Sequence, residues 1–300
     1  MVLTGVVAFA ACGPKEGAVS SRHKIDQVLA EETVYMDENV YYHHGSHVSE
    51  QWHWDGRTLY RIDYIDNGPY SENFFYDGRN RLTRTTVPAY GIRNEFHYDG
   101  RRLDSIECFQ GDSKYYTLVF FHEGKTLTEM EWRYEPDTKS PLTQKQERAA
   151  VCKTLERVMG ADIASLLTQP AQGKGAANTT RYRFEWYKDN VTRIDVSGTN
   201  ANYTVQLAYD DKRNIYRQLF AYSEENDPMY GFEMLSKNNI VSIIMPFRND
   251  DSQQFSYSYI YDGKFPLQRT QTYFYNVINE VDWTVSECRH QRTETFVPLD

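Results

Sequence analysis

One phrase recurs in the first half of the chain: Trp52-His53-Trp54-Asp55-Gly56-Arg57-Thr58-Leu59, then Phe74-Phe75-Tyr76-Asp77-Gly78 with Leu82, then Phe96-His97-Tyr98-Asp99-Gly100-Arg101-Arg102-Leu103. In each copy two aromatic residues flank one other residue, an Asp-Gly pair follows, and an apolar residue comes next. Successive Asp-Gly pairs begin 22 residues apart, and Glu123-Gly124 follows after 24. Self-similarity at a nearly fixed period predicts a repeat fold.

Each Asp-Gly pair predicts a tight turn between two strands. Asp-Gly tolerates the positive φ angles of a type I′ turn, so a pair flanked by alternating apolar residues indicates a β-hairpin. Asn and Asp tolerate the same backbone region, so worn copies are expected in the second half of the chain. These copies are Tyr187-Lys188-Asp189-Asn190, Tyr209-Asp210-Asp211, Lys237-Asn238-Asn239 and Tyr261-Asp262-Gly263.

The aromatic residues before each turn are expected to face the core. Residues two apart share one face of a strand, so Trp52 and Trp54 belong to one stripe that continues in the other copies. After the turn the apolar spacing is three, as in Leu59 with Ile62. An odd spacing puts two residues on opposite faces unless a β-bulge intervenes. Either both faces are partly covered or a bulge recurs.

Two segments depart from this pattern. Residues 143–168 predict a short helical insertion, because Val151, Leu155 and Val158 recur at helical spacing. Residues 22–32 fit either a helix or a first strand.

Composition supports a mainly β protein. The 300 residues include 24 Tyr and 15 Phe, while mean hydropathy is -0.70, so large rings alternate with polar residues as in strands. We predict a long twisted antiparallel meander of hairpin repeats that curls, rolls into a partial barrel or splits, with residues 18–300 as a single domain. The net charge of -9 and the lack of a basic block exclude a nucleic-acid partner.

The start of the chain predicts a lipid anchor. Residues 2–11 are apolar and small, and Ala10-Ala11-Cys12-Gly13 resembles a bacterial lipoprotein signal, in which the cysteine is lipidated. We therefore expect residues 1–17 to be signal and tether, with Cys12 as the lipidation site. Cys108, Cys152 and Cys288 are expected to be buried free thiols, although a disulfide between two of them remains an alternative.

Two copies of the phrase, residues 76–83 and 98–103, resemble the tyrosine-aspartate (YD or RHS) repeat. Together with the lipoprotein-like start, the chain is similar to surface lipoproteins of Bacteroidetes that carry such repeats. The resemblance covers residues 40–135 well and 180–275 loosely. It implies an antiparallel, strongly twisted meander in the cell envelope, anchored to the outer membrane on its surface or periplasmic side.

No local motif for catalysis or metal binding stands out, and no cofactor is expected. His43-His44-Gly45-Ser46-His47 gathers metal-capable side chains, but a structural zinc site needs four ligands, so we interpret it as a solvated hairpin turn. His53 and His97 lie between paired aromatics and are expected on the opposite face, partly exposed. The paired carboxylates adjacent in sequence point apart on a strand and indicate no glycosidase.

Surplus tyrosines predict binding instead. Exposed Tyr stacks on sugar rings and anchors protein interfaces, so a ladder of tyrosines on the second face of the strands would bind a ligand. The residues expected to bind are Tyr41, Tyr42, Tyr60, Tyr64, Tyr115 and Tyr116. The first functional hypothesis is a lipid-anchored binding or scaffold module for a glycan or protein. The alternatives are an extracellular polymer hydrolase, whose acids converge from several repeats, and a structural spacer.

Overall fold

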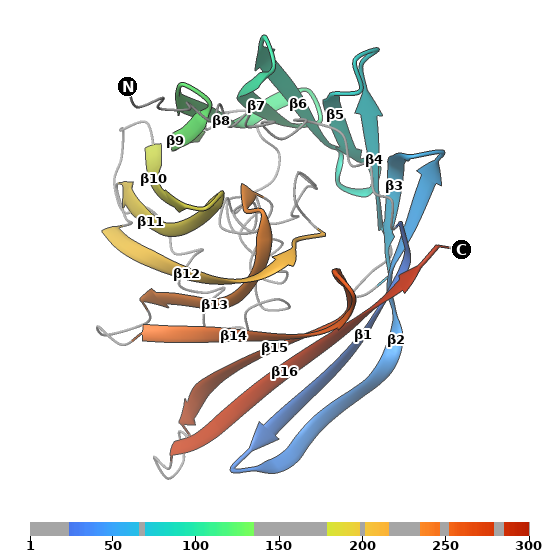
Figure 1. Ribbon diagram of the computed structural model, residues 1–300, viewed down its shortest axis with the longest axis vertical. Coiled ribbons are helices and arrows are strands. Elements are labelled where there is room, and N and C mark those ends of the chain that lie inside the picture. The colour runs from blue at the N-terminus through green and yellow to red at the C-terminus, as the bar shows by residue number, and fades with distance from the viewer. Residues whose placement is uncertain are drawn as a thin grey trace, which may run out of the picture.

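The described residues form one closed antiparallel β-barrel of 16 strands, β1 to β16 (Figure 1). The computed structural model describes residues 24–65, 70–134, 179–198, 202–215, 235–246, 252–278 and 285–299. Each strand pairs with its neighbours in sequence, and β1 closes the ring on β16 with Ala30 opposite Glu294. The predicted β meander is confirmed. It closes completely rather than into a partial barrel, which removes the free edges of an open sheet.

The strands, in chain order, are β1 Ile25–Met36, β2 Asn39–Asp55, β3 Thr58–Tyr64, β4 Tyr70–Tyr76, β5 Leu82–Val87, β6 Ile92–Asp99, β7 Arg102–Gln110, β8 Ser113–Glu123, β9 Thr126–Tyr134, β10 Thr179–Tyr187, β11 Asn190–Gly198, β12 Asn202–Arg213, β13 Asn238–Pro246, β14 Ser252–Asp262, β15 Phe265–Ile278 and β16 Val285–Pro298. A 3₁₀ turn, η1 Pro88–Tyr90, joins β5 to β6. Of the two readings of residues 22–32, the strand is the correct one from Ile25 onward.

Several predictions from the sequence fall on other parts of the chain. The signal and tether of residues 1–17, with Cys12, the helical insertion of residues 143–168, and Cys152 lie outside the described residues. Cys108 and Cys288 are buried free thiols, as expected. Among the described segments, no helix is long and apolar enough to cross a bilayer.

Most of the predicted turns occur where the sequence places them. Gly56 and Gly100 have φ of 54° and 62°, and Lys188 and Asp189 take the same region at 49° and 65°. The worn copies at Asp210 and at Asn238 are exceptions, because β12 continues through the first to Arg213 and β13 begins at Asn238, inside the second. β12 and β13 are therefore not joined by a tight turn at Asp210.

A β-bulge recurs just after the turns and explains the spacing of three. Trp54 pairs with Leu59 while His53 pairs with Arg61, so Tyr60 is the extra residue. The extra residues after the turns of other hairpins are Tyr41, Thr83, Asp104, Tyr115, Thr128, Thr192 and Leu267. Because each bulge shifts the alternation by one, Leu59 and Ile62 lie on the same face, and both are buried.

The second aromatic of several copies ties its hairpin to the preceding one. Tyr76 Oη donates to the carbonyl of Leu59, and Tyr98 Oη donates to that of Leu82, both at 2.8 Å. The same bond runs from Trp186 Nε1 to Leu127 and from Tyr209 to Val191, and in the last copy the first aromatic, Tyr259, makes it to Ile240. Most accepting residues directly precede a bulge, where a carbonyl leaves the regular ladder. The recurring aromatic thus buries its ring and satisfies a backbone acceptor.

The two faces of the barrel differ in chemistry. Trp52, Phe74 and Phe96 are 3–7% exposed, and their ladder partners Ile62 and Ile106 are buried as well. In a closed barrel one face of the sheet lines the interior and the other points outward. The convex side gives little cover to a side chain, so the buried aromatic rows face inward. The predicted orientation of the aromatic stripe toward the core is therefore confirmed.

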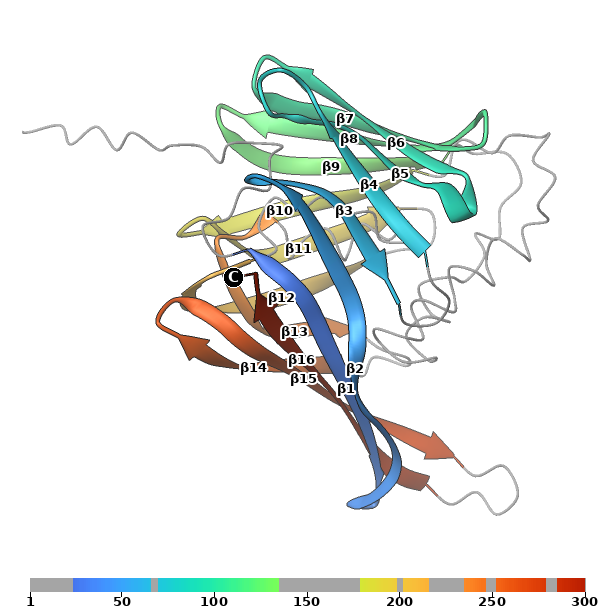
Figure 2. The same ribbon diagram turned by 90° about the vertical axis from the view of Figure 1, so that its right-hand side faces the viewer.

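Four strands extend beyond the body of the barrel. They are β1, β2, β15 and β16, and we call their projecting ends the finger (Figure 2). Asp37 and Glu38 make the turn at its tip with φ of 46° and 65°. The Asp37 carboxylate accepts a hydrogen bond from Ser286 Oγ at 3.0 Å, which links this turn to β16.

Candidate functional site

The outer surface of β2 to β11 carries alternating charges. Arg61 Nε lies 2.6 Å from Asp63, Arg193 Nη2 lies 2.9 Å from Asp195, and Glu131 binds arginines from two strands. His53 contacts Asp63 at 2.7 Å and His97 contacts Glu107 at 3.3 Å. Both histidines lie on the outer face, opposite the aromatic stripe, as the sequence predicts. Ion pairs of this kind are typical of solvent-exposed surfaces, where each contributes little to stability.

Glu95, His97 and Glu107 form the one group of three metal-capable residues found in the described segments, with ligand atoms within 4.8 Å of one another. Arg93 Nε already lies 2.9 Å from Glu95, and Lys114 Nζ lies 3.2 Å from Glu107. Each carboxylate therefore has its own cation. We interpret the group as an ion-pair network rather than a metal centre.

The outer surface of β12 to β16 is different, because it carries no charged side chain at fifteen adjacent positions. We call this surface the neutral face. Its residues are Gln206, Ala208, Ser242, Ile244, Gln254, Ser256, Ser258, Ile260, Gln268, Thr270, Thr272, Phe274, Gln291, Thr293 and Thr295. The ladder pairs them directly, for example Ser242 with Ser256 and Ser256 with Thr272.

The neutral face is open and internally ordered. Ser256, Ser258 and Ile260 of β14 are exposed. The hydroxyls of Thr270 and Thr293 lie 3.1 Å apart, and Gln291 Nε2 donates to Thr272 at 3.4 Å. Charges resume at its borders, with Asp195 of β11 on one side, Glu31 of β1 on the other and Arg289 of β16 opposite Phe274. Hydroxyl and amide groups therefore dominate this part of the barrel's outer wall.

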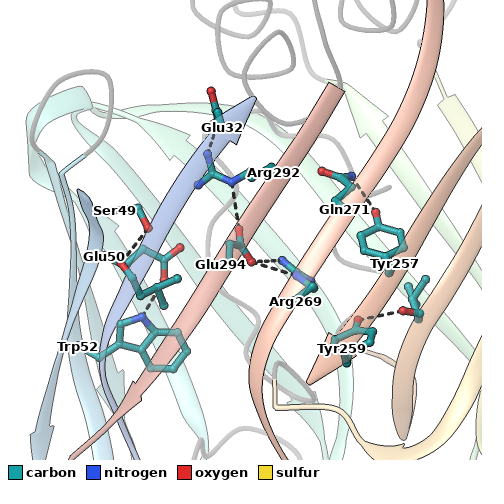
Figure 3. Close-up of polar contacts among 12 residues, drawn as sticks. Glu32, Ser49, Glu50, Trp52, Tyr257, Tyr259, Arg269, Gln271, Arg292 and Glu294 are labelled. Atoms are coloured by element: carbon teal, nitrogen blue, oxygen red, sulfur yellow. Dashed lines mark hydrogen bonds and ion pairs between the residues drawn. The ribbon is translucent and has the colours of Figure 1, made fainter. Parts of the chain in front are cut away.

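The inner wall carries a charged cluster where β15, β16, β1 and β2 lie side by side (Figure 3). We call Glu32, Glu50, Arg269, Arg292 and Glu294 the inner cluster. Arg292 lies 2.6 Å from Glu32 and 3.1 Å from Glu294, and Arg269 lies 2.7 Å from Glu294. Buried charges are costly unless paired in this way.

Two carboxyls of the inner cluster differ in protonation. Burial raises the pKa of Glu50 to about 7, helped by the charge of Glu294 and opposed by the hydrogen bond from Trp52 Nε1. Burial also acts to raise the pKa of Glu294, but Arg269 and Arg292 outweigh it, and that pKa lies below its ordinary value. Near neutral pH Glu50 exchanges a proton while Glu294 stays ionised.

The tyrosines expected to bind a ligand do not form one row. Tyr41 and Tyr42 are 71% and 49% exposed on the finger, and Tyr60 is 45% exposed at a bulge of β3. Tyr64 is half-buried and stacks on Tyr70 with ring centroids 4.7 Å apart.

The last two tyrosines of that set add no exposed ring to a ladder. Tyr116 is buried on the inner face, edge-on to Trp132, because the bulge of β8 turns it inward. The side chain of Tyr115 lies outside the described part of the structure.

The histidine-rich segment is not a turn, contrary to the sequence-based interpretation. His43 and His44 lie within β2, and the chain reverses earlier, at Asp37 and Glu38. The acidic turn residues adopt positive φ although neither is glycine. His43 Nδ1 instead lies 3.0 Å from Thr33 Oγ1 across the finger.

Comparison with known proteins gives a likeness of fold. No family model matches the chain, and no curated protein matches it. The crystal structure of a porin-like protein from Bacteroides uniformis ATCC 8492 aligns with 93% of this chain and 99% of its own, at 9% identity and a TM-score of 0.50. A porin-like protein from Bacteroides vulgatus ATCC 8482 aligns with 92% of this chain and all of its own, at 9% identity and a TM-score of 0.47. The chain is thus similar in fold to a solved porin-like barrel.

Proposed function

We propose that this protein is a lipid-anchored barrel of the cell envelope that lies outside the bilayer and binds or scaffolds a partner with its outer surface. The sidedness of the barrel carries the proposal. A membrane-spanning barrel turns an apolar band to lipid and polar residues to its lumen. Here the apolar rows face inward, and Arg61, Arg181 and Arg193 face outward.

The energetic cost of placing this barrel in the bilayer supports the proposal. An arginine on the lipid face of a barrel costs about 2–4 kcal/mol at the bilayer midplane. Several strands of this barrel carry arginine or glutamate at the middle of their outward face, so immersion in lipid would oppose folding. A water-facing barrel needs another means of attachment, and the lipoprotein-like sequence around Cys12 supplies one.

Two further lines support an envelope role. The similar fold from Bacteroides uniformis is described as porin-like, which favours an envelope location for this chain. The recurring turn, bulge and aromatic hydrogen bond favour assignment of the hairpins to the YD-repeat class. The neutral face supplies the broad β surface that a binding or scaffold role requires.

Fractionation tests this proposal. In a Gram-negative host, full-length protein should sediment with membranes, and the Cys12→Ser variant should move to the soluble fraction without detergent. Cys108→Ser is the matched control, since Cys108 is buried and should not alter attachment. If Cys12→Ser stays in the membrane pellet and needs detergent for release, the barrel itself is embedded and the proposal is wrong.

The inner cluster favours a second candidate function, hydrolysis of an extracellular polymer. Glu50, with a pKa of about 7, fits a general acid, and the ionised Glu294 comes from a different hairpin. The two arginines that bind Glu294 argue for a structural role instead. Incubation of wild type and Glu50→Gln with a panel of polysaccharides tests this candidate function. If the protein is a hydrolase, wild type releases sugar and the substitution abolishes that release. If wild type releases no sugar, hydrolysis is ruled out as the function.

A further inference from the structure

We propose that the neutral face binds an uncharged polysaccharide. This inference rests on the proposed function, because it assigns a ligand class to the outer surface of a barrel that lies in water. It concerns the hydroxyl and amide side chains of β13 to β16 rather than the tyrosines to which the sequence points.

The face offers hydrogen-bonding groups at regular intervals. Neighbouring strands lie about 4.8 Å apart, and side chains on one face repeat about every 6.8 Å along a strand. Ser242, Ser256, Thr272 and Gln291 stand in one row across four strands. A polymer whose hydroxyls also repeat is the natural partner of such an array.

The side chains are held in place before any ligand arrives. Thr270 and Thr293 approach each other at 3.1 Å, and Gln268 Nε2 donates to Thr295 Oγ1 at 3.3 Å. A hydroxyl has one donor and two acceptor positions, so a single cross-strand bond uses only part of its capacity. Ordering in the free protein lowers the entropy lost on binding.

The absence of charge at these fifteen positions selects the partner's chemistry. An anionic polymer calls for Lys and Arg, and a cationic one calls for Asp and Glu, yet the fifteen positions carry neither, and Arg289, opposite Phe274, lies at the edge of the face. The centre of a protein interface is enriched in aromatics and Arg and depleted in Ser. Here Ser256 and Ser258 stand at the centre, while Ile244 and Ile260 lie toward opposite ends. Phe274, 48% exposed, offers a ring on which a sugar can stack.

Affinity electrophoresis of the purified full-length protein in mild detergent tests the proposal. The gels contain dextran, mannan, xylan or laminarin as neutral polymers, or dextran sulfate as an anionic one. We expect at least one neutral polymer to retard the protein and dextran sulfate not to. The Ser256→Asp/Thr272→Asp variant should bind at least tenfold more weakly, because it puts two charges in adjacent rungs of the row.

Matched variants separate binding from folding. Thr86→Asp places a charge on the outer face of β5, away from the neutral face, and should leave retardation unchanged. Thr270→Ala removes a hydroxyl without adding charge and should weaken binding several-fold while far-UV circular dichroism stays the same. Equal retardation of wild type and both neutral-face variants would overturn the proposal, as would failure of every neutral polymer to retard wild type.

Failure of the polysaccharide proposal can be distinguished from failure of the proposed envelope function. If Cys12→Ser releases a soluble barrel but no neutral polymer binds, the envelope role stands and the ligand class is wrong. A photo-crosslinking residue placed at Ser256 in cells identifies what binds the neutral face. Adducts that are sensitive to periodate support a glycan ligand. A crosslinked protein without sugar refutes the polysaccharide proposal. A barrel that proves to be embedded in lipid removes both proposals together.

Discussion

Replacing Glu50 by Gln should change how the stability of the barrel depends on pH. The pKa of Glu50 is about 7 in the folded protein, against 4.5 for the ordinary carboxyl, chiefly because the group is buried and secondly because Glu294 is near. The folded state therefore holds a proton more tightly than the unfolded state. Such a group destabilises the fold progressively as pH rises from about 4.5 to about 7.

The magnitude follows from the same values. Each pKa unit corresponds to about 1.4 kcal/mol, so a rise from 4.5 to about 7 gives about 3 kcal/mol as an upper figure. Glu50 retains partial contact with solvent, which reduces the expected effect to about 1–2 kcal/mol. Gln keeps the shape and an acceptor for Trp52 Nε1 but never ionises. The variant should gain stability relative to wild type as pH rises.

Urea unfolding of full-length wild type and Glu50→Gln at pH 5, 6, 7 and 8 measures this effect. The difference in unfolding free energy should favour the variant increasingly between pH 5 and pH 8. Glu185→Gln is the matched control on the outer wall, where the side chain is 65% exposed, and should show no such trend. Parallel pH profiles for wild type and Glu50→Gln would refute the reasoning.

Three further predictions follow from packing and backbone geometry. Glu294→Gln should destabilise by about 3 kcal/mol at pH 7, because it leaves two inner arginines without their shared carboxylate; chemical unfolding measures this, and a neutral result contradicts it. Tyr98→Phe should cost about 1 kcal/mol in the same assay, because the carbonyl of Leu82 loses its donor, and an unchanged midpoint counts against the linking role of that bond. Gly100→Ala should cost about 1 kcal/mol, because φ is +62°, whereas Gly78→Ala, with open space and no positive φ, should be nearly neutral; equal thermal shifts would contradict the turn assignment.

The local parts of the fold were predictable from the sequence, because they depend on neighbouring residues. Asp-Gly pairs specify tight turns, and the alternation before each turn identifies which aromatics point inward. The spacing of Leu59 and Ile62 left two readings, and pairing across the hairpin decides for the bulge at Tyr60. The interpretation of residues 43–47 as a turn was wrong, because glycine is typical of turns but β2 runs through Gly45.

The candidate sites were not predictable, because they depend on pairings between distant strands. Ser242, Ser256 and Thr272 form a row only after three strands are brought into register. Glu50 and Glu294 meet only because β1 closes on β16, and a one-residue slip there would send one of them outward. The sequence held one usable signal, the scarcity of charged residues in β13 to β15 compared with β9 to β11.

The central claim is that the charged outer wall meets water rather than lipid. Single cysteines at Thr86 and Ser105, both on the outer face, test it in a background that otherwise keeps only Cys12. Open membrane fragments that carry the anchored full-length protein are treated with a water-soluble maleimide. We predict equal labelling of both positions with and without detergent. Labelling that appears only after detergent is added would show that the wall is immersed in the bilayer and would contradict the account.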